Sequence, residues 1–587
     1  MKIPTKLVSA AAVAAVTLMA AGCGGSTTPV ETFAEAEDPV AADSTAWDGV
    51  RKGLNAMWGS TDCLYSRSVP PASQDAPKSI RLTAWRGERV SAQVVLWSAS
   101  GAQSVVCATD DFTSDGATLP AGIATARFVR YTIADKSDPK CICPRPQNHP
   151  AVLQPDMLDS LDRFDMAART TRPVWITVNV PADAPAGIYR SQITVTRGDG
   201  CGKIRLPFEL EVQDHLLPPP TEWRYHLDLW QHPAAVARAE GVELWSDAHF
   251  EALRRTMKIL ADAGQKVITA TLNKDPWNHQ CYDAYDDMIR WTLAADGTWH
   301  YDYTIFDRWV ELMLSLGIDG MINCYSMVPW NNELVYNDEA SGSPVTVKAE
   351  PGTPEFERMW TPFLKDFKQH LAAKGWLEKT NIAMDERSPE AMDAAVKVLE
   401  KCAPEMGFAL ADNHSSYKRY TMMRDVCVNI NQKFDRADLD ARRAEGYSTT
   451  FYVCCGPHFP NTFTYSNPWE SELLGWYGLA AGFDGMLRWA YNSYPKDPAY
   501  DSRFSGFPSG DTYFVYPYAR SSIRMEKLVE GIQNVEKVRL LREADPAKVK
   551  DIDAILAEMM TMNILDPQQP WLDITCRARK ALDEASR

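Results

Sequence analysis

Eight short apolar segments alternate with amphipathic helical patterns between residues 225 and 489 of this 587-residue chain. The predicted strands are 225–230, 267–272, 321–325, 381–384, 408–411, 426–430, 450–454 and 486–489. Helical patterns between them include 247–263, 304–316, 354–374, 389–402 and 435–445. This alternation predicts a TIM-like (β/α)8 barrel. An open doubly wound sheet is the alternative, although no strand is followed by the G-x-G-x-x-G motif of a dinucleotide site.

The segment before the barrel is rich in short β-strand patterns separated by Pro and Gly. Residues 174–180, 188–195 and 204–212 predict strands, and 181–187 predicts a turn. Such spacing is typical of a β-sandwich, which we place at 46–216. The stiff Leu217-Pro218-Pro219-Pro220 connector then leads into the barrel, placed at 217–545. Helical patterns at 521–542, 546–562 and 571–586 follow, and the last two predict C-terminal helices over 546–587.

Two segments interrupt the strand and helix alternation. Residues 288–303 predict a hairpin, because Asp296-Gly297 is a strong turn signal between alternating segments. Residues 331–353 are polar and contain Gly, Ser and Pro, which predicts a long loop over the barrel mouth.

The N-terminal segment predicts export rather than folded structure. Lys2 and Lys6 precede an apolar run over 7–19 that is too short to span a bilayer. Ala20-Ala21-Gly22-Cys23 resembles the lipobox of bacterial lipoproteins, although Leu is usual where Ala20 stands. The resemblance implies a signal peptide at 1–22 and a lipidated Cys23. The small, polar and acidic residues that follow predict a flexible tether, placed at 23–45. The expected location is the bacterial cell envelope, at the outer membrane or cell surface; the alternative is an ordinary cleaved signal peptide.

Composition excludes several classes of protein. The formal net charge of −16 makes the chain a poor nucleic-acid binder, and the lipid anchor is the only expected membrane contact. The 13 cysteines form no C-x-x-C pair; Cys141 and Cys143, and the adjacent Cys454 and Cys455, are the close spacings. No H-E-x-x-H or G-x-S-x-G motif is present, so neither a metal site, a cofactor nor an esterase nucleophile is predicted.

Polar and aromatic residues follow many of the predicted strands. The carboxyl ends of barrel strands meet at one face, which is where barrel enzymes place their active sites. Candidate substrate-binding residues there are Trp230, Tyr325, Asn413, His414 and Trp489. Core packing is the alternative for the aromatic side chains, and a structural role is the alternative for His414. A ring of neutral hydrogen-bonding and aromatic groups suits a neutral polyhydroxylated ligand better than a phosphate.

Two adjacent carboxylates end the fourth predicted strand. Strand alternation directs Asp385 toward the barrel axis, and Glu386 stands where the strand breaks. Ser388 and Pro389 are a good N-cap and first residue for the following helix. The alternative is that the two carboxylates cap this helix or pair with Arg387.

Adjacent carboxylates fit poorly with the usual glycosidase geometries, in which the groups flank the scissile bond. They fit a substrate-assisted mechanism better, in which the sugar's own 2-acetamido oxygen attacks the anomeric carbon. Such a reaction needs one acid for the leaving oxygen and one carboxylate for the acetamido group. Because two close negative charges raise the pKa of one of them, we expect a protonated Glu386 beside an ionised Asp385.

Several motifs, taken in their order along the chain, resemble glycoside hydrolase family 123. They are Arg172-Pro173-Val174-Trp175, Pro185-Ala186-Gly187-Ile188-Tyr189, Phe306-Asp307-Arg308-Trp309 after the hairpin at 291–303, Asn381-Ile382-Ala383-Met384-Asp385-Glu386, Gly510-Asp511-Thr512, and Ser522-Ile523-Arg524-x-Glu526-x-Leu528. The resemblance implies a β-sandwich before a barrel, and a retaining, substrate-assisted β-N-acetylgalactosaminidase. It also implies that Asp385 stabilises the acetamido group and that Glu386 is the general acid/base.

The same resemblance implies that the partner is a glycan with a terminal N-acetylhexosamine, with glycosphingolipid glycans as one substrate class. Three alternatives stay open: hydrolysis of another β-N-acetylhexosaminide, an endo-acting enzyme, or a non-catalytic, lipid-anchored glycan-binding protein. The presence of both Asp385 and Glu386 argues against a pure binding protein, which has no need of the pair.

Overall fold

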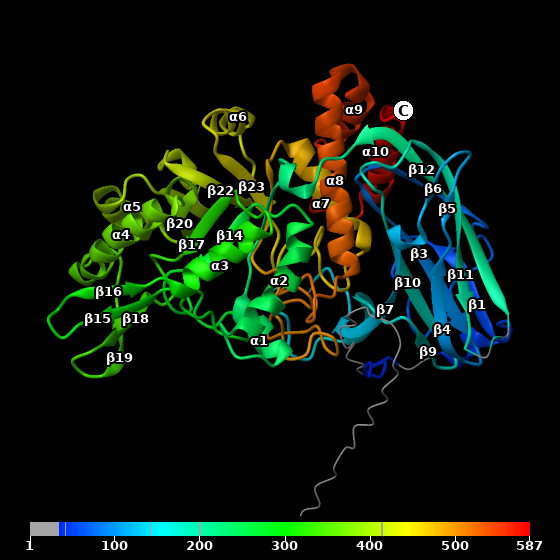
Figure 1. The fold of residues 1–587 in the computed structure, drawn as a ribbon, viewed down its shortest axis with the longest axis horizontal. Helices are drawn as coiled ribbons and strands as arrows, with labels where there is room; N and C mark the ends of the chain where they lie inside the picture. The colour runs from blue at the N-terminus through cyan, green and yellow to red at the C-terminus, as the bar shows by residue number, and fades with distance from the viewer. Residues whose placement is uncertain (1–33, 41–42, 141–142, 199, 201, 413–414) are drawn as a thin grey trace, which may run out of the picture. The chain divides into compact units, whose positions relative to one another are not determined.

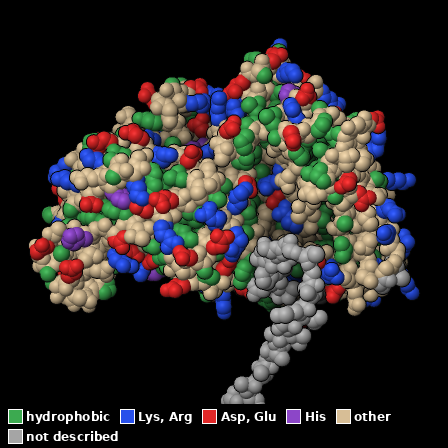
Figure 2. Space-filling view, viewed as in Figure 1, with side chains coloured by type: hydrophobic (Ala, Val, Ile, Leu, Met, Phe, Trp, Pro, Cys, Tyr) green, Lys and Arg blue, Asp and Glu red, His purple; other side chains and the backbone are tan. Residues whose placement is uncertain are grey.

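The computed structural model describes residues 34–587 except 41–42, 141–142, 199, 201 and 413–414. The predicted signal peptide and Cys23 therefore lie outside the described residues, as do Asn413 and His414. None of the described helices is long and apolar enough to cross a membrane. On the face shown in Figure 2, basic and acidic side chains of the described residues are interspersed rather than gathered into one patch.

Two sheets form the N-terminal region (Figure 1). The first has the order β1 (Leu54–Gly59), β3 (Arg89–Ser98), β10 (Thr170–Asn179), β7 (Ala124–Asp135), β8 (Ala151–Asp159). The second has the order β2 (Ile80–Arg86), β12 (Lys203–Leu216), β11 (Gly187–Thr196), β4 (Ala102–Thr109), β9 (Phe164–Met166), with β5 (Phe112–Thr113) and β6 (Thr118–Leu119) attached. Their inner faces share one apolar core, as in a β-sandwich.

The central strand β10 is buried on both of its faces. Val174 and Ile176 point into the sandwich core. Trp175, which alternation directs the other way, packs against Ile523 at the start of helix α8. The outer face of this sheet is therefore covered by protein, which explains why the strand is buried at nearly every position.

The eight predicted barrel strands form one parallel sheet. In sheet order they are β13 (His226–Leu229), β24 (Gly485–Arg488), β23 (Ser448–Tyr452), β22 (Met423–Asn429), β21 (Gly407–Asp412), β20 (Thr380–Asp385), β17 (Met321–Tyr325) and β14 (Val267–Thr271). A parallel bridge between Leu227 and Gln265 brings the two ends of this order together. The predicted fold class, a β-sandwich followed by a (β/α)8 barrel, is confirmed; the domain limits themselves stay predictions.

The described residues form ten α-helices, of which α2 to α6 and α8 to α10 lie close to the predicted ranges, whereas α1 and α7 were not among those ranges. The ten helices are α1 (Pro233–Glu240), α2 (Asp247–Ala261), α3 (Thr304–Ser315), α4 (Pro354–Lys374), α5 (Pro389–Cys402), α6 (Arg436–Ala444), α7 (Pro468–Ala481), α8 (Ile523–Ala544), α9 (Lys550–Met559) and α10 (Trp571–Ala585). Short 3-10 helices are η1 (Ser44–Trp47), η2 (Ala121–Ile123), η3 (Pro220–Glu222), η4 (Leu377–Lys379), η5 (Ser416–Lys418) and η6 (Pro546–Val549). Side chains cap the starts of α2, α4 and α5, at Ser246, Thr353 and Ser388.

The prediction of a long loop over 331–353 is wrong. This segment forms a hairpin of β18 (Glu333–Asp338) and β19 (Ser343–Lys348). It extends the predicted hairpin of β15 (Arg290–Leu293) and β16 (Trp299–Asp302) into a four-stranded sheet. The polar, Gly-containing part is the turn between the strands, where Gly342 has a φ of 68°. Leu334 and Tyr336 form the buried face of this hairpin, which the sequence analysis did not predict.

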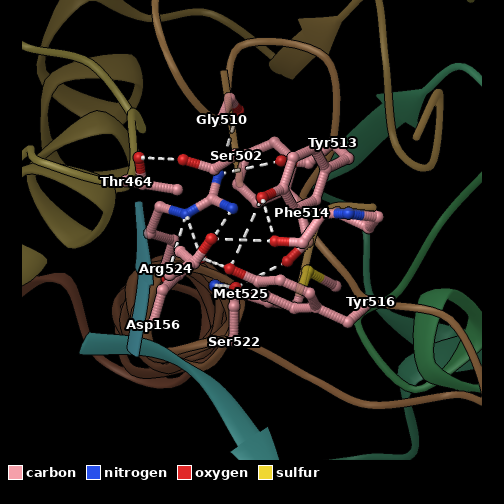
Figure 3. A network of polar contacts seen from close by, with 12 residues as sticks. Asp156, Thr464, Ser502, Gly510, Tyr513, Phe514, Tyr516, Ser522, Arg524 and Met525 are labelled. Atoms are coloured by element: carbon pink, nitrogen blue, oxygen red, sulfur yellow. Dashed lines mark hydrogen bonds and ion pairs between the residues drawn. The ribbon is translucent and has the colours of Figure 1, made fainter. Parts of the chain in front are cut away.

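A buried charge network ties the sandwich to the barrel (Figure 3). Arg524, in the first turn of α8, donates to Asp156 on β8 at 2.9–3.1 Å. Its other nitrogen donates to the backbone carbonyls of Thr462, Gly510 and Tyr513. Both charged side chains are almost completely buried. One arginine therefore fixes a sandwich strand, helix α8 and the 510–513 segment in a single arrangement.

Candidate active site

Asp385 is the last residue of β20 and points into the barrel mouth. Two residues earlier, Ala383 belongs to the apolar cluster that fills the barrel interior, so alternation directs Asp385 to the same side. The indole Nε1 of Trp277, on the segment after β14, donates to Asp385 Oδ2 at 3.1 Å. This hydrogen bond fixes one oxygen of the Asp385 carboxylate.

Glu386 turns into the same mouth because the strand breaks there. Its backbone adopts a left-handed conformation with a φ of 47°, and its N–H donates to Ala411 O at 3.0 Å. Its side chain is reached from β23, where the Tyr452 hydroxyl donates to Glu386 Oε1 at 2.6 Å. A non-glycine residue in this region carries strain, which is common at functional sites. Both carboxylates are thus held over one opening by aromatic donors.

The pKa of Asp385 differs from the prediction. Loss of hydration, with a smaller contribution from the Glu386 charge, raises the pKa of Asp385 to about 7. The Trp277 hydrogen bond and Arg387 oppose this rise. The sequence analysis expected an ionised Asp385, whereas burial favours its protonated form, because Asp385 ends the strand inside the barrel wall. Glu386 lies beyond the strand and is exposed.

Aromatic rings pack closely beneath Asp385. Trp277 contacts Trp230, Tyr325 and Tyr285, with ring centroids 5.2, 4.9 and 4.5 Å apart. All four side chains are at most 4% exposed. The structure therefore brings the predicted Trp230 and Tyr325 together and adds Trp277 and Tyr285, which the sequence analysis did not single out. The segment Asp275-Pro276-Trp277, which follows the second predicted strand, was the sequence signal that could have identified Trp277.

Trp489 lies at the end of β24 and is partly exposed. Its Nε1 donates to Asp511 Oδ2 at 3.2 Å, and its ring packs on Phe507 at 5.1 Å. Asp511 also forms a fully buried ion pair with Arg488 at 2.7 Å. Burial raises the pKa of Asp511 to about 6. Asp511 therefore orients Trp489, a role that the sequence analysis did not assign to it.

Comparison with known protein families decides the identity of this site. The glycoside hydrolase 123 catalytic domain matches residues 230–541, and the glycoside hydrolase 123 N-terminal domain matches residues 58–197. The chain belongs to glycoside hydrolase family 123. The predicted resemblance is thereby confirmed, and the barrel mouth is the mouth of a glycosidase.

A solved structure of the same family is similar over nearly the whole chain. It is a family 123 glycoside hydrolase from Clostridium perfringens, described in terms of glycolipid glycan hydrolysis. It is 26% identical, with a TM-score of 0.83, and the match covers 91% of this chain and 98% of that one. A comparison with curated protein sequences finds no relative.

Two further solved structures are remote matches to this family 123 hydrolase. A putative α-galactosidase from Bacteroides fragilis is 9% identical, with a TM-score of 0.24 over 78% of this chain and 77% of that one. A family 20 exo-β-N-acetylglucosaminidase from Vibrio harveyi is 8% identical, with a TM-score of 0.21 over 68% and 81%.

Two predicted residues of the family 123 site cannot be placed, because Asn413 and His414 lie outside the described residues. The preceding Asp412, which ends β21, accepts hydrogen bonds from the Ser416 backbone and hydroxyl at 2.5 and 3.0 Å. Among the residues that the structure describes, no cluster of His, Cys, Asp and Glu side chains is arranged to hold a metal ion.

Proposed function

We propose that this family 123 hydrolase releases terminal β-linked N-acetylgalactosamine by an exo-acting, retaining, substrate-assisted mechanism. The observation that carries the proposal is the adjacent pair Asp385 and Glu386, held over one mouth by Trp277 and Tyr452. Adjacent residues on one strand end do not readily flank a glycosidic bond from opposite sides. They do reach two neighbouring groups of one sugar, the glycosidic oxygen and the 2-acetamido group.

In the first step, Glu386 protonates the glycosidic oxygen while the acetamido oxygen attacks the anomeric carbon. The glycosidic bond breaks, the aglycone leaves with the proton, and an oxazolinium ring forms. Asp385 accepts a hydrogen bond from the acetamido N–H and stabilises the positive charge that develops there. A hydrogen bond donated by the substrate favours the ionised carboxylate, so binding itself opposes the burial that raises the pKa of Asp385.

In the second step, the Glu386 carboxylate removes a proton from water, whose oxygen attacks the anomeric carbon on the face that the aglycone left. The ring opens to restore the acetamido group, and Glu386 regains its proton. Two inversions at one carbon retain the β configuration. The exposed position of Glu386 suits this exchange, since both the aglycone and water approach from solvent.

The proposed substrates are glycans with a terminal N-acetylhexosamine, glycosphingolipid glycans among them. Support comes from the Clostridium perfringens relative, whose described reaction is on glycolipid glycans. The aromatic side chains at the mouth, including the partly exposed Trp489, suit the apolar face of a sugar ring. We further propose that Cys23 is lipidated and holds the enzyme at the bacterial cell envelope, on the basis of the lipobox-like sequence.

The test is hydrolysis of the 4-nitrophenyl β-glycosides of N-acetylgalactosamine, N-acetylglucosamine and galactose. The proposal expects turnover of the N-acetylgalactosaminide and none of the galactoside, which has no acetamido nucleophile. Preferred turnover of the N-acetylglucosaminide would reassign the sugar and keep the mechanism. Turnover of the galactoside at a similar rate would refute acetamido participation. Glycan binding without hydrolysis of any glycoside would favour a binding protein.

A further inference from the structure

Four aromatic rings, which we call the aromatic row, lead from the barrel mouth onto the protein surface. The row begins at Trp489, which packs against the apolar cluster of the barrel interior. The ring centroid of Phe507 lies 5.1 Å from that of Trp489, and Phe504 lies 6.3 Å from Phe507. Tyr282 follows, 6.2 Å from Phe504. All four side chains are partly or largely exposed, and Tyr282 is 44% exposed. Exposed apolar rings that are contiguous, unlike scattered ones, mark a binding surface.

Arginine side chains hold the aromatic row in place. The Arg238 guanidinium lies 4.5 Å from the centroid of the Tyr282 ring. Arg238 is itself fixed by both carboxylate oxygens of Asp283, at 2.7 and 2.8 Å. Arg145, in the sandwich connection between β7 and β8, donates to Phe507 O at 3.3 Å. Rings that are fixed before binding lose little conformational entropy when a ligand stacks on them.

We propose that the aromatic row binds the sugars that follow the terminal N-acetylhexosamine in the oligosaccharide chain of the substrate. This inference rests on the proposed exo-acting function, in which the barrel mouth encloses only the terminal sugar. The rest of the chain is the leaving group, and it must pass over the rim of the mouth. The aromatic row starts at that rim with Trp489 and offers ring faces on which the apolar faces of successive sugars can stack.

A sugar chain suits the aromatic row better than the lipid part of a glycolipid does. Charged groups border the row at both Tyr282 and Phe504. Arg238 lies over Tyr282, and Arg503, which is ion-paired with Asp501 at 2.7 Å, directly precedes Phe504. A hydrocarbon chain along the row would remove water from these charges without replacing its hydrogen bonds, which costs free energy. Sugar hydroxyls can form such hydrogen bonds while the sugar ring faces an aromatic ring.

The first test compares kcat/KM for three substrates that share a terminal β-linked N-acetylgalactosamine. They are the 4-nitrophenyl glycoside, a disaccharide, and a tetrasaccharide whose other three sugars are neutral hexoses. The wild type should prefer the tetrasaccharide over the disaccharide, mainly through a lower KM, because stacking is present both before and during the reaction. Tyr282→Ala should lower kcat/KM for the tetrasaccharide about tenfold relative to the 4-nitrophenyl glycoside.

Two matched variants are the controls for Tyr282→Ala. Tyr282→Phe keeps the ring and should retain the preference for the tetrasaccharide. Tyr500→Ala removes a tyrosine that is equally exposed, at 45%, but is not part of the aromatic row, and it should behave like the wild type. Equal kcat/KM for the disaccharide and the tetrasaccharide in the wild type would overturn the proposal. An equal loss of tetrasaccharide preference in Tyr282→Ala and Tyr500→Ala would also overturn it.

Binding of the trisaccharide that remains after removal of the terminal sugar is a second test, and it requires no turnover. Isothermal titration calorimetry should show binding to the wild type and an affinity about tenfold lower in Tyr282→Ala. Trisaccharide binding that is absent, or that does not depend on Tyr282, would overturn the aromatic row as a glycan site. A failure to hydrolyse any of the glycosides would instead refute the proposed function.

The same tetrasaccharide attached to ceramide distinguishes sugar binding from lipid binding. The glycolipid in detergent micelles and the free tetrasaccharide should lose the same fraction of kcat/KM in Tyr282→Ala. A loss confined to the glycolipid would overturn the proposal in favour of a lipid-binding surface.

Discussion

The Tyr452→Phe variant tests whether Glu386 must be held in place for catalysis. The Tyr452 hydroxyl donates to Glu386 Oε1 at 2.6 Å, and this is the side-chain contact that reaches Glu386 from across the mouth. Burial and the Glu386 carboxylate raise the pKa of Tyr452, so the phenol keeps its proton and remains a donor. The variant removes one oxygen and leaves the ring that packs in the barrel interior.

The expected loss follows from the strength of this bond. A hydrogen bond to a charged group contributes about 1.5–3 kcal/mol. Since about 1.4 kcal/mol corresponds to a tenfold change in rate, kcat/KM should fall about 10- to 150-fold. The loss should be largest for a natural disaccharide, whose leaving oxygen needs full protonation by Glu386. It should be smaller for the 4-nitrophenyl glycoside, whose leaving group needs less help.

The assay compares kcat/KM for both substrates in Tyr452→Phe and in the matched control Tyr303→Phe. The Tyr303 hydroxyl also donates to a carboxylate, that of Asp366 at 2.7 Å, but between α3 and α4. The control should stay within about twofold of the wild type, as is usual for changes away from the site. Wild-type rates in Tyr452→Phe would refute the reasoning. An equal loss for both substrates would show that Tyr452 does not act through proton transfer.

Further variants probe the carboxylates and the domain contact. Glu386→Gln should abolish hydrolysis of natural glycosides and retain part of the activity on the 4-nitrophenyl glycoside. Asp385→Asn should lower kcat/KM at least about a hundredfold for both substrates. Equal losses for both substrates in Glu386→Gln, or a wild-type rate in Asp385→Asn, would contradict these roles. The wild-type kcat/KM should fall as pH drops through about 7, because Asp385 must be ionised. Trp277→Phe removes a hydrogen-bond donor that favours the ionised form of Asp385, so the pKa of Asp385 should rise. The fall of kcat/KM at acidic pH should then begin at a higher pH than in the wild type. An unchanged pH profile would exclude Asp385 as the titrating group. Arg524→Met leaves the buried Asp156 carboxylate without its cationic partner, which should cost about 3–5 kcal/mol and lower the urea midpoint measured by tryptophan fluorescence. An unchanged midpoint would show that the network is not stabilising.

Local signals explain why much of the barrel was predictable. Helix α5 begins where Ser388 and Pro389 supply a cap and a first residue, and both of its ends were predicted correctly. The eight strands were found because a parallel barrel strand is buried on both sides and reads as an apolar run. The β18–β19 hairpin was missed because its alternation is weak and its partner, β15, lies far away in sequence. A hairpin at the protein surface leaves only a weak hydrophobic pattern in the sequence when just one of its faces packs against other residues.

In the candidate active site, too, some features follow from local sequence and others only from tertiary contacts. Asp385 and Glu386 were placed by strand alternation and by the break after β20, both of which are local. Their partners Trp277 and Tyr452 were not singled out, because each hydrogen bond spans more than 60 residues of sequence. The raised pKa falls on Asp385 for a similar reason, since desolvation depends on every segment that surrounds a group.

The sequence by itself determined the order of strands and helices, the family and the carboxylate pair, because periodicity, capping residues and motif order are properties of short segments. Only the tertiary structure decided which aromatic residues hold the carboxylates, and that Asp385 is desolvated. Closure of the barrel and docking of the sandwich bring these groups together. Contacts and burial of this kind are set by the path of the whole chain, and no local pattern encodes them.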